Sequence, residues 1–521
     1  MKSSTQYIKF LLSTTLFISF VYSLLIFPQS KSKLSLSFNY VNTNAEIILD
    51  NDRLHPNCKS LLNSENRFAF SSTNNFSTAN YLDSIDYNYI PWEADKHFWV
   101  AFGELVIIEF IPWALARWGR DWDNPEDNWA NVSPETWWRN ISSGWEYDGD
   151  AFLTNYFAHP YHGNTYYNAG RVNGYSFWES SVWAFAGSAF WEFFGETTRP
   201  SINDLINTSL NGINLGEMLF RLSAVVTDNT ETGTTRVFQE IGGVLLNPVR
   251  GFSRLVTGET SKNFPNPEES NPKGFGFKLD AGLRRLDKNG DVNATEEVNE
   301  GVFSAEILYG NLFRGNIKKP FSWFGISAAI STRDPLLTNL QSFGNLYGWH
   351  LKKSKDTRHI SVITLNYNYF NNPGFTYGGT SVNPHIVSLY NLGEEFNFLT
   401  NLDIELIAMG AVPTDYYVDA EGRNYDFGPG IGINLGASLI KGNWNFARIY
   451  YSSKWIWTQS EPSDSRHHLH LVWFDVTYPF LDYLAVGLGL GAYWRNSYYE
   501  NEEDVFKRNR IIRLFLRAAL N

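Results

Sequence analysis

The feature that most constrains this chain is a sustained alternation of apolar and polar residues through its C-terminal half. In residues 431–439, isoleucine, leucine and alanine alternate with glycine, asparagine and serine, and residues 303–309, 484–490 and 512–520 repeat the pattern. A period of two is typical of a β-strand with one apolar and one polar face. About twelve such runs fill residues 274–521, which leaves about 21 residues for each strand and its turn. A membrane-spanning β-strand needs ~9–11 residues, so this spacing suits one.

Composition supports a barrel that spans a membrane with strands. Aromatic residues make up 17% of the chain, charged residues only 18%, and there are 40 glycines. The mean hydropathy of −0.29 excludes a bundle made only of transmembrane helices. We therefore predict an antiparallel transmembrane β-barrel of about 12 strands, with a soluble two-layer β-protein as the alternative. The aromatic residues predicted to form its interfacial girdles are Tyr367, Tyr369, Tyr450, Tyr451, Trp455, Trp457, Tyr493 and Trp494.

The N-terminal segment predicts export. Lys2 and Lys9 precede an apolar stretch at residues 10–27, which is followed by polar residues. This is the pattern of a secretory signal peptide, expected over residues 1–30, and an uncleaved inner-membrane anchor is the alternative. Residues 31–92 are rich in Asn, Ser, Thr and Asp and predict a disordered polar linker.

A helical domain is predicted at residues 93–260. Apolar residues at helical spacing indicate helices over residues 100–117, 177–194, 201–227 and 236–256, the last interrupted at residues 247–248. Glu104 and Glu109 lie in the first of these helices, and a carboxylate near a bilayer centre costs at least ~2.5 kcal/mol. We therefore expect the domain outside the hydrocarbon, in the periplasm. A proline-containing linker at 261–273 would join it to the barrel, which gives an α+β fold class.

Charge and cysteine content exclude two classes of protein. The formal net charge is −12, which argues against a nucleic-acid partner because a phosphate-binding surface needs a basic excess. The single cysteine, Cys58, excludes an intramolecular disulfide and a cysteine-based zinc cluster.

Polar residues that carry chemistry are concentrated in the helical domain. The densest segments are residues 159–163, with the sequence His-Pro-Tyr-His-Gly, and residues 191–196, with the sequence Trp-Glu-Phe-Phe-Gly-Glu. Further polar groups follow at Pro200-Ser201-Ile202-Asn203-Asp204, Gly216-Glu217 and Asn247-Pro248-Val249-Arg250. From about Asp150 to Arg254 this pattern resembles the DUF3943 family, a group of bacterial proteins of unassigned function. The resemblance implies an exported envelope protein with a β-rich C-terminal half, and it implies no activity.

The same segments provide the candidate site residues. We expect Pro160 to place His159 and His162 in a loop, where two imidazoles and Glu192 could bind zinc or another divalent metal. In a catalytic site, His159 or His162 would act as a general base beside Glu179, Glu192 or Glu196. The candidate binding residues are Arg171, Asn203, Asp204 and Glu217.

A structural role is the interpretation that we favour for these residues. Buried His, Glu, Arg, Asn and Asp side chains in a helical domain often satisfy one another, and Arg171 and Arg221 would neutralise Glu179 and Glu217. A second cluster, His467, His468 and His470, falls near a predicted strand start, where His468 and His470 would share one face.

Two classes of function remain open. The first, which we favour, is a structural, binding or transport-related outer-membrane barrel in which the helical domain lies in the periplasm or plugs the lumen. Its partners would be outer-membrane lipids and the barrel assembly machinery. The second is an envelope enzyme that acts on a lipid or glycan at the His/Glu cluster. The sequence names no substrate.

Overall fold

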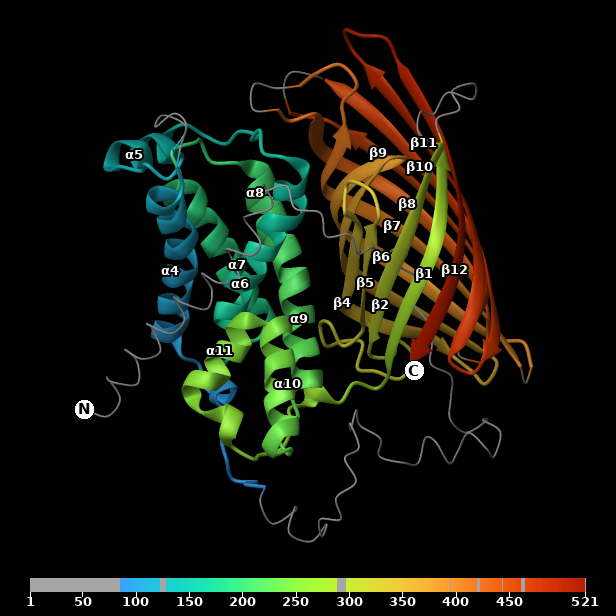
Figure 1. The fold of residues 1–521 in the computed structure, drawn as a ribbon, viewed down its shortest axis with the longest axis horizontal. Coiled ribbons are helices and arrows are strands. Elements are labelled where there is room, and N and C mark those ends of the chain that lie inside the picture. Colours follow the sequence, from blue (N-terminus) through green and yellow to red (C-terminus); the bar gives the residue numbers. More distant parts are fainter. Residues whose placement is uncertain are drawn as a thin grey trace.

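The computed structural model describes residues 85–121, 128–287, 297–393, 395–418, 422–442, 444–460 and 464–520. Within these ranges the chain forms a helical domain followed by a closed β-barrel (Figure 1). The predicted signal peptide, residues 1–30, and most of the predicted polar linker, residues 31–92, lie outside the described residues.

The helical domain contains the four helical regions that the apolar spacing predicts. Its helices are α4 (Phe98–Ala114), α5 (Pro134–Ser142), α6 (His159–Arg171), α7 (Phe177–Phe190), α8 (Ile202–Ile206), α9 (Gly212–Val226), α10 (Gly233–Leu246) and α11 (Pro248–Thr257). The π-helical turns are η3 (Leu115–Gly119) after α4, η5 (Thr154–Ala158) before α6, η6 (Trp191–Gly195) after α7, and η7 (Asn207–Asn211) between α8 and α9. Short 3-10 turns lie at η2 (Trp92–Ala94), η8 (Glu259–Ser261) and η9 (Glu268–Ser270).

Side-chain caps explain where several helices begin. The hydroxyl of Ser176 accepts a hydrogen bond from the backbone of Glu179, whose carboxylate in turn accepts one from Ser176, which forms a capping box at α7. Ser201 caps α8 and Asn247 caps α11 in the same way, each accepting from a backbone N–H three residues on.

The predicted loop at His159 is wrong. His159 and Pro160 instead form the first turn of α6. The fixed φ of proline matches a helix, and the π-helical turn η5 (Thr154–Ala158), which runs directly into α6, replaces the regular α-helical bonding before it. His159 and His162 therefore project from a helix, three residues apart.

The barrel has twelve antiparallel strands, as predicted, and each pairs with its sequence neighbour. They are β1 (Phe275–Asp287), β2 (Glu297–Tyr309), β3 (Phe324–Ser331), β4 (Leu337–Lys353), β5 (Thr357–Asn372), β6 (Phe375–Asn391), β7 (Phe396–Pro413), β8 (Tyr425–Lys441), β9 (Trp444–Trp457), β10 (Ser465–Leu481), β11 (Leu484–Tyr499) and β12 (Val505–Leu520). Pairing of β1 with β12, with Leu283 opposite Leu514, closes the barrel. Closure leaves no unpaired edge strand, as a membrane-spanning sheet requires.

Alternation sorts the strand residues into an outer apolar face and an inner polar face. On β8, Leu435 is 43% exposed, whereas its neighbour Asn434 is buried and Ser438 is buried on the same inner side. On β12, Leu514 is exposed and Arg513 and Arg517 are buried. Leu435 and Leu488 therefore face outward and Asn434 faces the lumen, which confirms the predicted facing.

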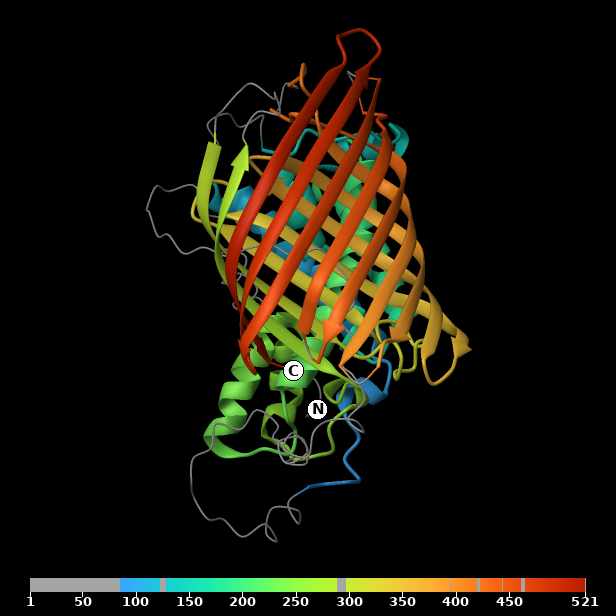
Figure 2. The same ribbon diagram turned by 90° about the vertical axis from the view of Figure 1, so that its right-hand side faces the viewer.

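The helical domain packs against the outer wall of the barrel. Figure 1 shows it beside the strands from β4 to β8, and Figure 2, turned by 90°, shows it behind the orange and red strands. The Asn214 side chain donates to the backbone oxygen of Leu365 at 2.7 Å and accepts from the Ser342 hydroxyl at 2.6 Å. The Thr380 hydroxyl donates to Asn211 at 2.9 Å. Serine and threonine are unusual on the outer face of a barrel, and these contacts supply their partners.

This packing corrects two predictions. The domain lies outside the lumen, so it does not plug the barrel. Tyr367 and Tyr369 were predicted to join an interfacial girdle, but both are buried beneath the helical domain, and the Tyr367 hydroxyl donates to the backbone oxygen of Tyr156. Tyr450 and Tyr493 also leave the predicted girdle, because their side chains belong to a cluster inside the barrel.

Candidate functional site

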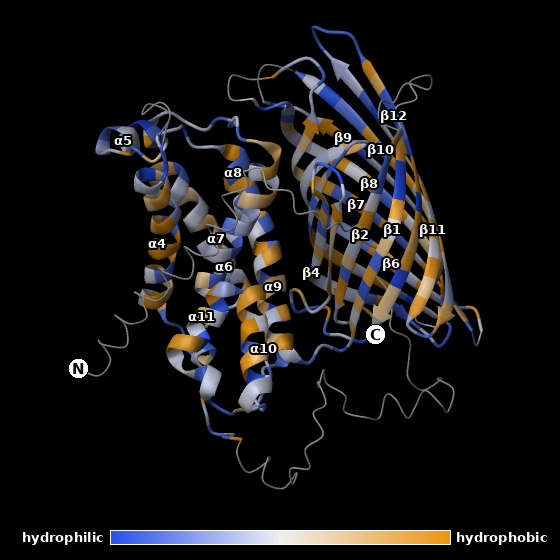
Figure 3. Ribbon diagram, viewed as in Figure 1, coloured by the Kyte–Doolittle hydropathy of each residue, from blue (hydrophilic) through white to orange (hydrophobic). Residues whose placement is uncertain are grey.

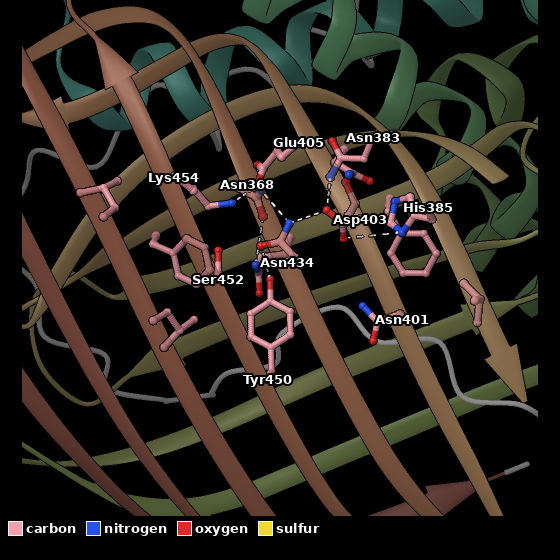
Figure 4. Close-up of a pocket in the computed structure, with 18 of the residues that line it drawn as sticks. Asn368, Asn383, His385, Asn401, Asp403, Glu405, Asn434, Tyr450, Ser452 and Lys454 are labelled. Atoms are coloured by element: carbon pink, nitrogen blue, oxygen red, sulfur yellow. Dashed lines mark hydrogen bonds and ion pairs between the residues drawn. The ribbon is translucent and has the colours of Figure 1, made fainter. Parts of the chain in front are cut away.

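Polar side chains gather in two separate places, the first of which is a cavity inside the barrel (Figure 4). The cavity has an empty volume of about 870 Å³, open solvent included. Side chains from β4 to β10 line it. The polar side chains that line it are Gln341, Asn366, Asn368, Asn383, His385, Asn401, Asp403, Glu405, Asn434, Ser452 and Lys454, and aromatic rings come from Trp323, Phe343, Phe370, Phe375 and Tyr450.

Asn434 is the centre of the hydrogen-bond network in this cavity. Its amide nitrogen donates to Asp403 at 2.6 Å and to Glu405 at 3.2 Å, and its oxygen accepts from the Tyr450 hydroxyl at 2.9 Å. Asn383 donates to the same oxygen of Asp403 at 3.2 Å. These bonds hold the inward-facing side chains of β6, β7, β8 and β9 in a fixed arrangement (Figure 4).

The charges of the cavity nearly cancel. Lys454 forms an ion pair with Glu405, and His385 Nδ1 lies 3.6 Å from Asp403 Oδ2. The Thr364 hydroxyl lies 2.7 Å from the other ring nitrogen of His385. One carboxylate, that of Asp403, therefore has amides and an imidazole around it in place of a fixed cation.

Apolar layers cross the lumen on both sides of the cavity. The first apolar layer lies toward the end of the barrel with the longer connections, where inward-facing residues from at least eight strands meet. They include Leu286, Phe370, Phe375, Tyr377, Ile407, Ile456, Leu471, Trp473, Tyr493 and Ile511. Toward the other end, a second cluster includes the β2–β3 connection; its members include Leu312, Phe313, Ile317, Trp323, Phe343, Val362, Leu389, Leu399 and Ile440. Apolar side chains therefore lie in the lumen on both sides of the cavity.

Ion pairs line the wall formed by β9, β10, β12 and β1. Arg517 Nε donates to Asp280 Oδ1 at 2.7 Å, and Arg513 pairs with the same carboxylate. Arg448 Nε donates to Asp475 at 3.0 Å. Each buried arginine has a carboxylate partner, as burial of a charge requires.

The second polar place is the end of the helical domain that carries α5 and α8. His159 Nε2 lies 3.4 Å from Asp150 Oδ2 and 3.6 Å from Asp204 Oδ2. Asp148, Asp150 and His159 each offer a ligand atom within 4.8 Å of the other two. Asp148 and Asp150 were not singled out from the sequence, although their spacing of two residues just before the histidine motif was a usable signal.

The predicted metal triad of His159, His162 and Glu192 does not form. The Glu192 carboxylate accepts from the backbone N–H of Ser201 at 2.7 Å. His162 Nδ1 lies 3.3 Å from the Tyr166 hydroxyl, and its ring contacts Trp191 edge-on. Since the partners of the two histidines differ, they do not converge on one point.

The remaining predicted catalytic glutamates separate as well. Glu179 lies at the opposite end of α7 from Glu192, where it caps the helix and pairs with Lys96 at 2.5 Å. Glu196 stays near the His159 cluster, and burial raises its pKa to about 7, against the opposing effect of His159. Burial also raises the pKa of Asp204, and the nearby charges of Asp148 and Glu192 add to this shift.

The candidate binding residues belong to two networks. Glu217 is fully buried and accepts from Arg171 at 3.0 Å, from Arg221 at 2.7 Å and from the Tyr167 hydroxyl at 2.7 Å. Asn203 donates to Asp148 at 3.0 Å and to Asp204 at 3.0 Å. These bonds join α8 to the group formed by Asp148, Asp150 and His159, which we call the acidic cluster. Both arginines thus neutralise Glu217, and Glu179 pairs with Lys96 in place of the expected arginine.

Three π-helical turns, η5, η6 and η7, adjoin the acidic cluster. His159 follows η5, Glu192 lies in η6, and Asp204 precedes η7 by three residues. Such turns are rare and occur frequently at functional sites.

The histidines of β10 lie on both faces of the barrel wall. His467 is buried inside between Ser465 and Ser497, each at 2.9 Å. His468 and His470 share the outer face, as predicted, with ring centroids 3.9 Å apart, and they contact Trp455 and Trp494. This outward cluster lies on a strand and not at the edge of a loop.

Fold and sites together define a β-barrel protein with an attached helical domain. Residues 144–249 match the family model described as "Domain of unknown function (DUF3943)", the family that the histidine and glutamate motifs predict. No curated protein matches the chain.

Solved structures similar to this chain are membrane barrels by their titles. An outer membrane channel from Pseudomonas putida F1 is 12% identical, with 49% of this chain and 100% of that chain covered and a TM-score of 0.28. An anion-selective porin from Comamonas acidovorans is 8% identical, with 47% and 99% covered and a TM-score of 0.21. The KdgM porin is 8% identical, with 47% and 99% covered and a TM-score of 0.24. At these scores the similarities carry no argument about function.

Proposed function

We propose that this protein is an outer-membrane barrel whose lumen binds and passes a small, hydroxyl-rich solute such as a sugar or polyol. The observation that carries the proposal is the polar cavity around Asn434, enclosed within a closed barrel whose outer face is apolar. Insertion of such a barrel would make outer-membrane lipids and the barrel assembly machinery its partners.

The connections between strands support an orientation in the membrane. At the end where β1 begins and β12 ends, four of the five connections, β4–β5, β6–β7, β8–β9 and β10–β11, have at most four residues, and the β2–β3 connection is the exception with 14. The opposite end carries the longer connections between β7 and β8, β9 and β10, and β11 and β12. Outer-membrane barrels have short periplasmic turns and longer extracellular loops, so the short-turn end would face the periplasm.

The lining of the cavity favours a neutral solute with many hydroxyl groups. Amide side chains such as Asn383 and Asn434 both donate and accept, which matches a hydroxyl group. Aromatic rings at Phe375 and Tyr450 give flat apolar surfaces beside them. Since Lys454 is paired with Glu405, a bound anion would meet the carboxyl group of Asp403, which has amides and the His385 imidazole around it.

Liposome swelling tests this proposal. Vesicles containing the Tyr493→Ala protein, in which the apolar layer is opened, should swell several-fold faster in a monosaccharide than in a dicarboxylate of similar size. Asn434→Leu added to that protein should slow entry of the sugar, whereas Ser438→Leu, also on the inner face of β8, should slow it less. Swelling no faster than protein-free vesicles would contradict the proposal, as would recovery of the protein in the soluble periplasm.

A second candidate function rests on the acidic cluster of the helical domain. We propose that Asp148, Asp150 and His159 bind a divalent cation, with zinc as the first to test because one ligand is an imidazole. A bound cation would lower the pKa of a water molecule and so allow hydrolysis of a lipid or glycan. Stoichiometric zinc that is lost in His159→Ala and kept in His162→Ala would support it, and metal-free protein after incubation with zinc would contradict it.

A further inference from the structure

The interior of the helical domain is polar. Asn168, Asn173 and Asn214 are fully buried, each with hydrogen-bond partners on another helix or on the barrel, and Glu217 is buried with its two arginines. The central helix α6, which contacts α4, α7 and α9, contains two histidines and two asparagines among its 13 residues. Helices that associate within a membrane commonly use small residues and polar side chains of this kind at their interfaces.

The exterior of the domain is apolar, the reverse of a soluble protein. On α4 and its extension η3, the exposed side chains are Phe98, Trp99, Phe102, Val106, Phe110 and Trp118. On α7, the exposed apolar side chains are Trp178, Val182, Phe185 and Phe190. Figure 3 shows α4 coloured largely as hydrophobic, on the side of the domain away from the barrel. Soluble proteins rarely expose so large a contiguous apolar surface.

The two carboxylates of α4 face the interior. Glu104 accepts a hydrogen bond from Asn173 at 2.6 Å, and Glu109 accepts one from the Tyr166 hydroxyl at 2.8 Å. Both are buried. The sequence argument that these residues keep the helix out of hydrocarbon therefore fails, because neither carboxylate lies on the outer face.

The length and direction of the helix fit a bilayer. Phe98–Gly119 has 22 residues and contains an 18-residue window with a mean hydropathy of 1.7, and among the described helices it is the one long and apolar enough to cross a membrane. At 1.5 Å per residue it is about 33 Å long, against ~30 Å of hydrocarbon. Aromatic residues lie at both of its ends, with Trp99 at one and Trp118 at the other, where interfacial rings belong. Figure 1 shows α9 next to the barrel wall and α4 on the opposite side of the helical domain, both running roughly along the height of the barrel.

We infer that the helical domain is embedded in the lipid bilayer beside the barrel, with α4 and α7 facing the acyl chains. The inference rests on the proposed function, because it takes the barrel to span the membrane. A domain packed on the outer wall of a spanning barrel occupies the place of lipid, so its own outer surface continues the apolar face of the barrel. The domain is then an integral part of the membrane protein, in place of the periplasmic domain expected from the sequence.

Fluorescence quenching of the full chain tests this inference. Cys58→Ser removes the native thiol, and single cysteines at Val106, Val182, Leu435 and Ser142 receive a bimane label. The labelled proteins are reconstituted in phosphatidylcholine vesicles whose acyl chains carry a doxyl group. We expect lipid quenching at Val106→Cys and Val182→Cys within about twofold of Leu435→Cys, the barrel reference. Ser142→Cys, on the exposed face of α5, should respond chiefly to aqueous iodide.

The reference position separates the two claims. Iodide quenching at Val106→Cys and Val182→Cys, with lipid quenching kept at Leu435→Cys, overturns the embedding and leaves the barrel in the membrane. Protection from both quenchers indicates a protein partner on this face and also overturns it. Loss of lipid quenching at Leu435→Cys contradicts the proposed function itself.

Discussion

Tyr493 of β11 stacks on Phe375 of β6 with ring centroids 4.6 Å apart and an angle of 14° between the rings. The two strands lie five places apart in a ring of twelve, so this contact crosses the lumen. It belongs to the apolar layer that also contains Trp473 and closes the barrel above the polar cavity. A lumen closed by side chains is one that single substitutions can open.

Removal of this ring should open the lumen. We expect Tyr493→Ala to raise the single-channel conductance in planar bilayers several-fold above that of the wild type, because the layer loses this contact across the barrel. Phe474→Ala is the matched control, since Phe474 also lies on the barrel wall but faces outward. Equal conductance of the wild type and Tyr493→Ala would show that the apolar layer is not the barrier.

The two faces of β8 should respond differently to arginine. Leu435→Arg places a charge on the lipid-facing side and should cost about 2–4 kcal/mol near the midplane. Ser438→Arg places the same side chain in the lumen and should cost less. The folded fraction, read from the mobility of unheated and heated samples on gels, measures both. Equal losses in the two variants would mean that the assigned faces are wrong.

The alternation of apolar and polar residues predicts the barrel, but it does not predict what covers the outer face of each strand. Residues 431–439 and the segment around Tyr367 alternate equally well, and in both cases one set of residues faces outward. The spacing of two residues indicates on which side of a strand a side chain lies, but the segment that covers that side cannot be inferred from it. Contacts between segments far apart in the chain, such as Asn214 with Ser342, decide that Tyr367 lies beneath helices and Leu435 does not.

The predicted grouping of His159 with His162 and Glu192 differs from the structure for a similar reason. The composition of the histidine and glutamate segments correctly indicated a polar domain interior, and Glu217 with its arginines follows the expected network. The direction in which a helical side chain points depends on the residue at which the helix begins. Pro160 predicts a loop, whereas the structure has Pro160 in the first turn of α6. Two carboxylates adjoin His159. Asp150 is nine residues away in the chain, where a sequence signal exists, whereas Asp204 comes from a more distant segment whose approach no local pattern reveals.

Neutralisation of Glu217 should destabilise the helical domain. Glu217→Gln removes the carboxylate that Arg171 and Arg221 share. Arg171 keeps its ion pair with Glu269, whereas Arg221 is left buried without its carboxylate, which should cost up to about 3–5 kcal/mol. Hydrogen exchange of peptides from α6 and α9 in the full chain measures the loss. Glu179→Gln is the control, because its ion pair with Lys96 is exposed and the amide keeps the helix cap. A similar effect in both variants would contradict the network.

Acidic pH should stabilise the end of the helical domain that contains Glu196. The pKa of Glu196 is about 7 in the folded protein, against 4.5 for the unfolded reference. The folded state therefore binds the proton more tightly, and this stabilisation is complete below about pH 4.5 and is lost as the pH rises toward about 7. From 1.36 kcal/mol per pKa unit, the loss is about 3 kcal/mol at most.

Hydrogen exchange of residues 144–204 between pH 4.5 and 7.5, corrected for the intrinsic rate, measures this dependence. Glu196→Gln should flatten it in part, and Asp204, whose pKa is raised in the same direction, should account for much of the remainder. A stability that rises with pH over this window would contradict the assigned protonation.

Cross-linking in intact cells tests the central claim, that the helical domain packs on the outside of the barrel. In a Cys58→Ser background, Asn214→Cys is combined with Ser342→Cys on the covered outer wall or with its neighbour Gln341→Cys, which lines the lumen. A short bis-maleimide or a mild oxidant should join the 214–342 pair and shift its mobility on denaturing gels, and should leave the 214–341 pair unjoined. Efficient cross-linking of the 214–341 pair, with none at 214–342, would place the domain in the lumen and contradict the account.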